Sequence, residues 1–312
     1  MFCLRGTALT RERTIGLALA LSAINLHSSA PAIAQSDAHS LEAVVRLAAA
    51  YVNEYQRALT AVLADEDYQQ QVVAQIPLDR SMPTKRGLRS EVFFMFAPAS
   101  GDWMAIRDVI AMDGATLAQR PNVREALRTL PPVEVARTFK AHNSRFNLGH
   151  MSRNFNEPTL SLLLLDDRYR PHVKFTRKGV QRSRDGVWVT IGFSENSSTH
   201  TLIRDLSQKP APSRGEFVIE AGTGRVRRAH METTFGASAV SGGMTAKLTT
   251  TFAPDYRLAM WVPVTFAEHY ESGEAVSFAP DPRIKLPSVF EEIRGLATYS
   301  NYRRFEVKVI IK

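Results

Sequence analysis

The antiparallel character of the fold is decided by residues 225–270, RVRRAHMETTFGASAVSGGMTAKLTTTFAPDYRLAMWVPVTFAEHY. Polar and apolar side chains alternate in three runs, and Gly242-Gly243 separates the first two runs. Alternation with a period of two is typical of strands that bury one face, and paired glycines favour tight turns between such strands. The stretch therefore predicts three consecutive antiparallel strands, at 225–235, 244–252 and 258–270.

The same alternation extends the series of strands in both directions. Turn residues separate several runs, as at Asp185-Gly186 and at Gly222-Thr223-Gly224, and their chemistry favours hairpins. Further strands are predicted at residues 88–96, 103–112, 172–177, 187–193, 200–205 and 216–220, and in a final run that ends at Lys312.

Helices are predicted before the strands and between them. Apolar residues recur in steps of three and four from Leu41 to Val62, with Ser40 at the N-cap position, which is the pattern of an amphipathic helix. This helix must cover an apolar surface, because its stripe cannot face water. A further helical region is expected at about residues 121–166, and its last part, residues 159–165, favours a short buried helix over a buried strand.

The first 34 residues have the three parts of a secretory signal peptide. The positive residues are Arg5, Arg11 and Arg13. Residues 14–26 form an uncharged segment that is too short to span a membrane. Small residues at Ala32 and Ala34 predict cleavage after Ala34, which places the mature chain, residues 35–312, in the periplasm or outside the cell. An uncleaved membrane anchor and a start codon assigned too early are the alternatives.

The amino-acid composition of the mature chain excludes some functional classes and favours others. Cys3 is the one cysteine and lies in the predicted signal peptide, so disulfides, thiolate metal sites and cysteine nucleophiles are excluded from the mature chain. The net charge is +8 and the pI is near 9.7. Outside the cytoplasm, this charge favours anionic lipid head groups or acidic glycans as partners over nucleic acid. The densest basic run, Arg168–Arg184, lacks interleaved stacking aromatics and is interpreted as the solvated face and turn of a hairpin.

No familiar reaction motif occurs in the sequence. The nucleophile patterns G-x-S-x-G and S-x-x-K are missing. On a helix, His142 and His150 would lie about 12 Å apart, too far to share a metal ion. The pairs Asp166-Asp167 and Glu291-Glu292 are expected at the solvated surface, because adjacent side chains point apart. We therefore expect no catalytic residue, no metal site and no cofactor, although a hydrolase triad assembled only in space stays open.

An unusual composition marks residues 143–159, NSRFNLGHMSRNFNEPT, which contain four asparagines and two arginines. Asparagine side chains bond to nearby backbone, so an irregular, self-satisfied connection is the favoured interpretation. The functional alternative is that Arg153, Asn154 and Asn156 line the mouth of a cavity and bind an anionic or amide group.

Several stretches resemble known families. SEVFFMF (90–96), RFNLGHMSRNFNEPT (145–159), TGRVRR (223–228) and WVPVTFAEHYE (261–271) look like stretches of uncharacterised secreted bacterial proteins. The Thr-Gly turn, the strand that leads to Trp261-Val262-Pro263 and the closing YSNYR strand (299–303) are similar to the periplasmic lipoprotein-carrier (LolA/LolB-like) superfamily. That resemblance implies a strongly curved, unclosed β-barrel that is roofed by helices and whose hollow shelters acyl chains.

The predicted elements agree with such a fold. We expect an α+β architecture in which a strongly curved antiparallel sheet of nine to eleven strands is covered by the N-terminal helix and by the inserted helices. No internal repeat or domain-scale linker interrupts residues 35–312, which predicts a single half-barrel domain. The sequence leaves open whether the hollow is empty or filled by side chains.

The leading functional hypothesis is an exported, non-catalytic binding protein for a lipid or another amphiphile, with lipid or lipoprotein acyl chains or an anionic envelope surface as partners. The alternative is a structural or interaction protein of the envelope with a packed core and no small-molecule ligand. A hydrolase is a third hypothesis, and it requires a Ser, a His and a carboxylate in one cleft.

Overall fold

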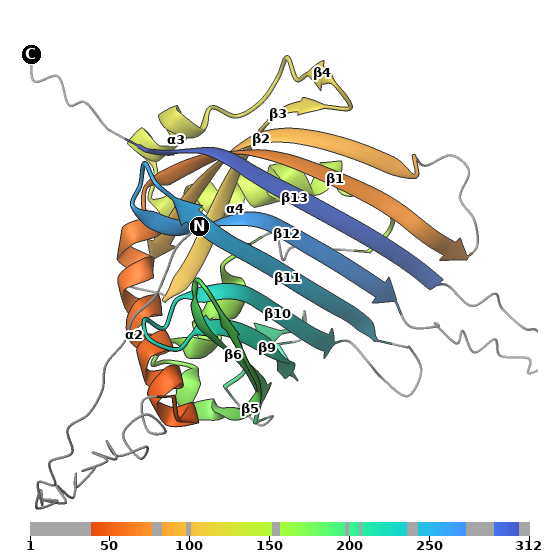
Figure 1. The fold of residues 1–312 in the computed structure, drawn as a ribbon. Helices are drawn as coiled ribbons and strands as arrows, with labels where there is room; N and C mark the ends of the chain where they lie inside the picture. Colours follow the sequence, from red (N-terminus) through yellow and green to blue (C-terminus); the bar gives the residue numbers. More distant parts are fainter. Residues whose placement is uncertain are drawn as a thin grey trace, which may run out of the picture.

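Eleven strands form one curved antiparallel sheet (Figure 1). The computed structural model describes residues 39–76, 83–97, 101–151, 157–196, 200–205, 208–235, 243–272 and 290–305, so the predicted signal peptide lies outside the described residues. The strand order is β4-β3-β2-β1-β13-β12-β11-β10-β9-β6-β5. Within the described part of the chain, the end strands β4 and β5 are not neighbours. The sheet is therefore an unclosed barrel, as the resemblance implies.

The elements have the following bounds. The strands of the sheet are β1 (Val62–Ile76), β2 (Lys85–Ala97), β3 (Asp102–Met112), β4 (Ala115–Thr116), β5 (Val173–Ser183), β6 (Gly186–Glu195), β9 (Ser213–Glu220), β10 (Val226–Phe235), β11 (Met244–Asp255), β12 (Met260–Ser272) and β13 (Phe290–Arg304). A second sheet pairs β7 (Ile203–Arg204) with β8 (Pro210–Ala211). The α-helices are α2 (Leu41–Leu59), α3 (Val123–Thr129) and α4 (Pro132–Asn143), and the short 3-10 helices are η1 (Ser144–Phe146), η2 (Leu160–Leu165) and η3 (Arg170–His172). Among the described residues, no helix combines the length and apolarity needed to cross a bilayer.

Alternation along β11 separates the two sides of the sheet. Ala246, Leu248 and Thr250 are buried, and the residues between them are partly exposed. The neighbouring strands are in register with this pattern, since Leu248 lies opposite Met231 of β10 and opposite Glu268 of β12. We refer to the buried side of the sheet as the inner face and to the opposite side as the outer face.

The first strand of the sheet pairs with the last. β1 is hydrogen-bonded to β13 from its first residue to its last, and it is bonded to β2 on its other side. The predicted continuation of the first helix to Val62 is wrong, and the sequence missed the strand that follows. α2 ends at Leu59, because Ala61 has a left-handed conformation (φ 61°) and its amide donates to the carbonyl of Phe94. Strand pairing therefore overrides the local helix preference of this polar segment.

α2 spans the opening between the two edges of the sheet. As predicted, Ser40 caps the helix, and its hydroxyl accepts a bond of 3.2 Å from the amide of Ala43. The helix contacts β2 near one edge of the sheet, β5 and β9 near the other edge, and η2. Figure 1 shows it beside the ends of β9, β6 and β5. Gly224 (φ 75°) in the β9–β10 turn lies directly against the helix, since a Cβ atom there would overlap the backbone of Leu47.

A smaller apolar cluster covers the outer face of β1 to β3. Its sheet residues alternate with inner-face residues, as Phe93 lies between Val92 and Phe94. α3 begins at Val123, because the side chain of Asn122 caps it. The members of the cluster are Leu63, Phe93, Met104, Ile106, Val123, Val135 and Phe139.

Of two other predicted elements, one helix is confirmed and one strand is shorter than predicted. Residues 159–165 do form a buried helix, η2, although it has 3-10 geometry. The strand predicted at 200–205 shrinks to two residues, because the amide of Leu202 donates to the buried carboxylate of Glu195 instead of a neighbouring strand. Residues 306–312 of the predicted final strand lie outside the described residues.

A buried ion pair crosses β2 on the inner face. The Nε of Arg107 on β3 donates to both carboxylate oxygens of Glu66 on β1, at 3.0 and 2.8 Å. The side chains are 10% and 1% exposed. Desolvation works to lower the pKa of Arg107, but the adjacent Glu66 carboxylate outweighs it and holds the pKa above its usual value. Arg107 therefore stays charged in the folded protein.

We expect Arg107→Met to lower the free energy of unfolding by about 3–5 kcal/mol, because it leaves the Glu66 carboxylate buried without its cation. The double variant Glu66→Gln/Arg107→Met should recover much of this loss, since no buried charge remains. Urea denaturation measures both changes. Arg128→Met, which breaks an exposed pair with Glu125, is the control and should cost less than about 0.5 kcal/mol. Equal losses for the single and the double variant would contradict the argument.

Candidate functional site

The hollow of the barrel is the region between the inner face of the sheet and the two helices α2 and η2. One stripe of α2 faces it, and the buried members of this stripe include Val44, Ala48, Val52 and Leu59. The leucines of η2 are also buried, and both helices belong to the same apolar cluster as the inner face. In this structure the hollow is thus occupied by side chains of the chain itself.

Three hydrogen-bond donors at the contact between α2 and the sheet are buried without an acceptor among the described residues. They are the hydroxyls of Tyr51 and Tyr55 on α2 and the indole Nε1 of Trp103 on β3. The ring centroids of Tyr55 and Trp103 are 6.0 Å apart, and those of Tyr51 and Tyr55 are 5.5 Å apart. A buried donor without a partner costs roughly 1–3 kcal/mol. An acceptor atom that reached these groups would therefore gain more than it would from donors that are already paired.

Burial also changes the acidity of the tyrosines at this contact. Desolvation raises the pKa of Tyr55 well above its usual value, and the nearby hydroxyls of Tyr51 and Tyr302 raise it further. Desolvation raises the pKa of Tyr51 as well, against the opposing charge of Arg225. These hydroxyls are neutral donors at physiological pH.

Glu268 forms a second polar centre on the inner face. Its carboxylate accepts bonds of 2.6 Å from the hydroxyls of Tyr68 and Tyr270. Gly295 leaves room for this contact, because a Cβ atom there would lie 2.6 Å from the Tyr68 hydroxyl. Arg107 is close enough for the charge of Glu268 to contribute to its raised pKa. The inner face therefore combines apolar walls with a charged, hydrogen-bonded layer.

The chain from Phe146 to Met151 is fastened to the inner face. The side-chain amide of Gln70 donates to the Phe146 carbonyl and accepts from the Leu148 amide, each at 3.1 Å. Glu291 accepts from the amides of His150 and Met151, at 3.0 and 2.9 Å. Glu291 is only 3% exposed, so its predicted position at the solvated surface is wrong. Its carboxylate supplies the acceptor that these two backbone amides would otherwise find in water.

Arg153, Asn154 and Asn156, the residues predicted to line a cavity mouth, lie outside the described residues. Their proposed role stays a prediction. The polar residues of the inner face, among them Glu66, Tyr68 and Gln70, were missed by the sequence reasoning. A signal for them exists, because these three occupy every second position of one strand.

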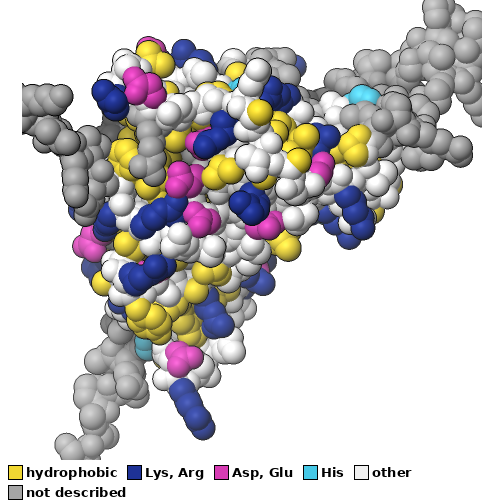
Figure 2. Space-filling model, turned by 90° about the horizontal axis from the view of Figure 1, so that it is seen from above, with side chains coloured by type: hydrophobic (Ala, Val, Ile, Leu, Met, Phe, Trp, Pro, Cys, Tyr) yellow, Lys and Arg dark blue, Asp and Glu magenta, His cyan; other side chains and the backbone are white. Residues whose placement is uncertain are grey.

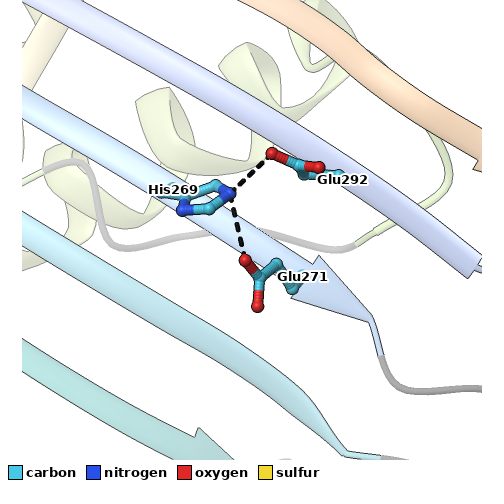
Figure 3. A group of neighbouring side chains, drawn as sticks. All are labelled: His269, Glu271 and Glu292. Carbon is cyan, nitrogen blue, oxygen red and sulfur yellow. Dashed lines mark hydrogen bonds and ion pairs between the residues drawn. The ribbon is translucent and has the colours of Figure 1, made fainter.

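The outer face carries a compact group of three metal-binding residue types, His269, Glu271 and Glu292 (Figure 3). The ring Nε2 of His269 lies 2.9 Å from Glu292 and 3.3 Å from Glu271. Sequence spacing could not reveal this group, because Glu292 comes from the neighbouring strand, where it pairs with Glu271. Imidazole and carboxylate are ligands that divalent metal ions accept. Arg294 (2.9 Å from Glu292) and Lys247 (3.6 Å from Glu271) already neutralise the two carboxylates, so a metal ion would have to displace both cations.

Opposite charges alternate over much of the outer surface. Figure 2 shows cationic and anionic side chains interspersed on the face seen from above. Many of the arginines are ion-paired, as in Arg214 with Glu232 at 2.9 Å and Arg303 with Asp65 at 2.8 Å. The positive net charge is therefore not spread evenly over the sheet.

The fold and the site define a class of protein, an unclosed antiparallel β-barrel whose hollow is plugged by its own helix. No family model matches the chain, and no curated protein matches its sequence. One similar solved structure is a Vibrio parahaemolyticus domain described as an outer membrane lipoprotein-sorting protein domain, with 10% identity over 81% of this chain and 91% of that chain. Lipovitellin, solved in a study of its lipid–protein interactions, is 8% identical over 81% of this chain and 26% of its own. Both TM-scores are 0.29, a similarity that assigns neither a family nor an activity.

We expect the chain to lose stability as the pH rises above about 10, the usual pKa of tyrosine. The pKa values of Tyr51, Tyr55, Tyr299 and Tyr302 are raised in the folded state by burial. A raised pKa stabilises the fold fully below the unfolded pKa, and the contribution disappears as the pH rises through the folded pKa. Tyrosinate absorbance measures the ionisation. The buried group should ionise only together with the loss of circular dichroism, and ionisation of all tyrosines in one step before unfolding would contradict this.

Proposed function

We propose that the chain is an exported, non-catalytic binding protein for a lipid or another amphiphile, with the hollow as its binding site and α2 as a plug that shifts aside but stays in contact with the bound ligand. The three unpaired donors at the contact between α2 and the sheet carry this proposal. They lie in an apolar cluster, where an amphiphile would place its alkyl chain. They also have no hydrogen-bond acceptor among the described residues, and the carboxyl or ester oxygens of the amphiphile would supply one.

The attachment of α2 supports a plug that can move. Its described hydrogen bonds to other elements come from its C-terminal half, as in Gln56 to Asp166 at 2.8 Å and Arg304 to the carbonyl of Ala58 at 2.7 Å. The rest of its contact with the sheet is apolar packing. Packing of this kind is not directional, so an alkyl chain can replace the helix side chains at comparable cost in free energy.

A structural or interaction protein of the envelope is the second candidate. The observation that favours it is the occupied hollow, in which α2, η2 and the inner face share one cluster. In that case the unpaired donors would be a tolerated cost of packing, and the helix would never leave the sheet. Export itself rests on the predicted signal peptide and is tested by sequencing the N-terminus of the mature protein.

We expect the delipidated mature chain to bind a fluorescent fatty acid, and Tyr51→Phe/Tyr55→Phe to weaken this binding about tenfold, through the loss of two hydrogen bonds to the ligand. The same variant should be at least as stable as the parent without ligand, because it removes two unpaired buried hydroxyls. Tyr270→Phe is the matched control. Its hydroxyl is paired with Glu268, so its loss should reduce stability without a specific effect on affinity. Failure of the parent chain to bind the probe, together with a native mass unchanged by envelope lipids, would favour the structural alternative.

We also expect Gly224→Ala to loosen α2, because the added Cβ would overlap the backbone of the helix. The variant should be less stable and should bind the fatty-acid probe faster in stopped-flow measurements. Gly114→Ala adds a Cβ at a similarly positive φ (84°) with no atom within 4 Å, so it reports the backbone strain alone. Gly222→Ala, in the same turn as Gly224 and also without a neighbour within 4 Å, reports the change of turn sequence. Equal association rates for Gly224→Ala and Gly114→Ala would show that α2 does not gate the site.

A further inference from the structure

The basic run at Arg168–Arg184 forms most of an edge strand. As predicted, it supplies the solvated face and turn of a hairpin, β5–β6. β5 is the last strand of the sheet, and among the described residues it pairs with β6 alone. It is 11 residues long, and eight of its residues are exposed. A strand in this position presents a row of backbone N–H and C=O groups that another chain can pair with.

The cations of this hairpin differ from those elsewhere on the sheet. Lys174, Arg177, Lys178 and Arg182 lie on β5, and Arg184 lies in the turn that follows. Within the described residues, none of them forms an ion pair, whereas Arg214 of β9 and Arg228 of β10 do. Arg214 contacts Glu232, and Arg228 contacts Glu216 at 2.6 Å. A row of cations without ion pairs among the described residues thus lies along an open sheet edge.

A groove beside β5 places part of this charge within reach of a docked chain. It has a volume of about 520 Å³, lies over β5, β6, β9 and β10, and is lined by Lys174, Lys178 and Arg214 together with the carboxylates Glu216 and Glu232. Both carboxylates are already ion-paired, with Arg228 and Arg214, which leaves Lys174 and Lys178 as its unpaired charges among the described residues. Gly192 of β6 keeps the groove open, since a Cβ atom there would lie 2.9 Å from the Thr176 hydroxyl. Side chains on one face of an added strand would lie beside Lys174, Thr176 and Lys178 at the rim of this groove, because side chains alternate between the two faces of a strand.

We propose that the edge of β5 binds an extended, acidic segment of a partner protein by strand addition, with acidic side chains of the segment beside Lys174 and Lys178. This interaction is independent of ligand binding in the hollow. Backbone pairing would supply affinity, and the unpaired cations would select an acidic partner. The same cations would repel a second copy of this edge, which prevents self-association through β5.

An anionic membrane is the other partner that the charge alone would fit. The edge fits a peptide better for two reasons. Its free N–H and C=O groups have a fixed spacing that only another strand matches. In addition, β5 exposes one large hydrophobic residue among its described residues, Val180, whose exposed fraction is 40%. This offers little apolar area for insertion into a bilayer.

The experiment measures fluorescence anisotropy of a labelled peptide of about ten residues with alternating glutamate and threonine, a length that matches an added strand. We expect the mature chain to bind this peptide, and Lys174→Glu/Lys178→Glu to weaken binding about tenfold or more. The control variant Arg137→Glu/Lys140→Glu reverses two exposed charges on α4 and should bind like the parent. A peptide with alternate backbone nitrogens methylated keeps its charge but cannot complete the strand ladder, so it should lose most of the affinity.

Each other result overturns the proposal. Equal binding of the methylated and unmethylated peptides would mean that charge alone acts, without strand addition. Equal loss in the two charge-reversal variants would mean that the interaction is non-specific. Binding to vesicles containing phosphatidylglycerol but not to the acidic peptide, with sensitivity to Lys174→Glu/Lys178→Glu, would assign the edge to a membrane surface. Circular dichroism and fatty-acid binding, which should be unchanged in both variants, show that these variants remain folded.

Discussion

The structure depends on one constraint, which is that an unclosed sheet cannot bury its own inner face. A closed barrel would cover its apolar interior with its own strands, but the order of this sheet ends at β4 on one side and at β5 on the other. Something outside the sheet must therefore cover the interior, and α2 does so by contacting β2, β5 and β9. The helix is required for burial, yet it belongs to no strand ladder. Because of this, the helix can leave the sheet without breaking a strand ladder, which is what the proposed function requires of it.

The polar groups of the hollow divide into two sets with different consequences. Glu66, Arg107, Glu268 and their tyrosine partners satisfy one another and make the inner face rigid. The hydroxyls of Tyr51 and Tyr55 and the indole of Trp103 are without acceptors among the described residues, and they lie where α2 meets the sheet. A core selected for stability alone would replace these donors by apolar groups. Their position at this contact links the cost in stability to the proposed binding function.

The candidate site illustrates where sequence reasoning ends. The composition of the polar stretch with Arg153, Asn154 and Asn156 suggested a binding site. The polar groups on the inner face of the hollow were not predicted. Glu268 lies on β12, but its buried partner Tyr68 comes from β1, 200 residues earlier along the chain. Glu291 and Glu292 are adjacent in sequence, but one ties down a buried segment and the other joins an ion-paired cluster on the opposite face. Only the register of β13 against its neighbours decides which of them is buried.

By itself, the sequence determined the antiparallel strand series, the N-capped amphipathic helix and the hairpin turns, because these depend on local periodicity and on the conformational preferences of turn residues. It did not determine β1, whose residues DEDYQQQ are as polar as a surface helix. That segment is a strand because it is held between β2 and β13. The tertiary structure alone decided that the hollow is occupied by α2 and that a charged layer lies inside it. These features follow from contacts between distant parts of the chain, which no local pattern records.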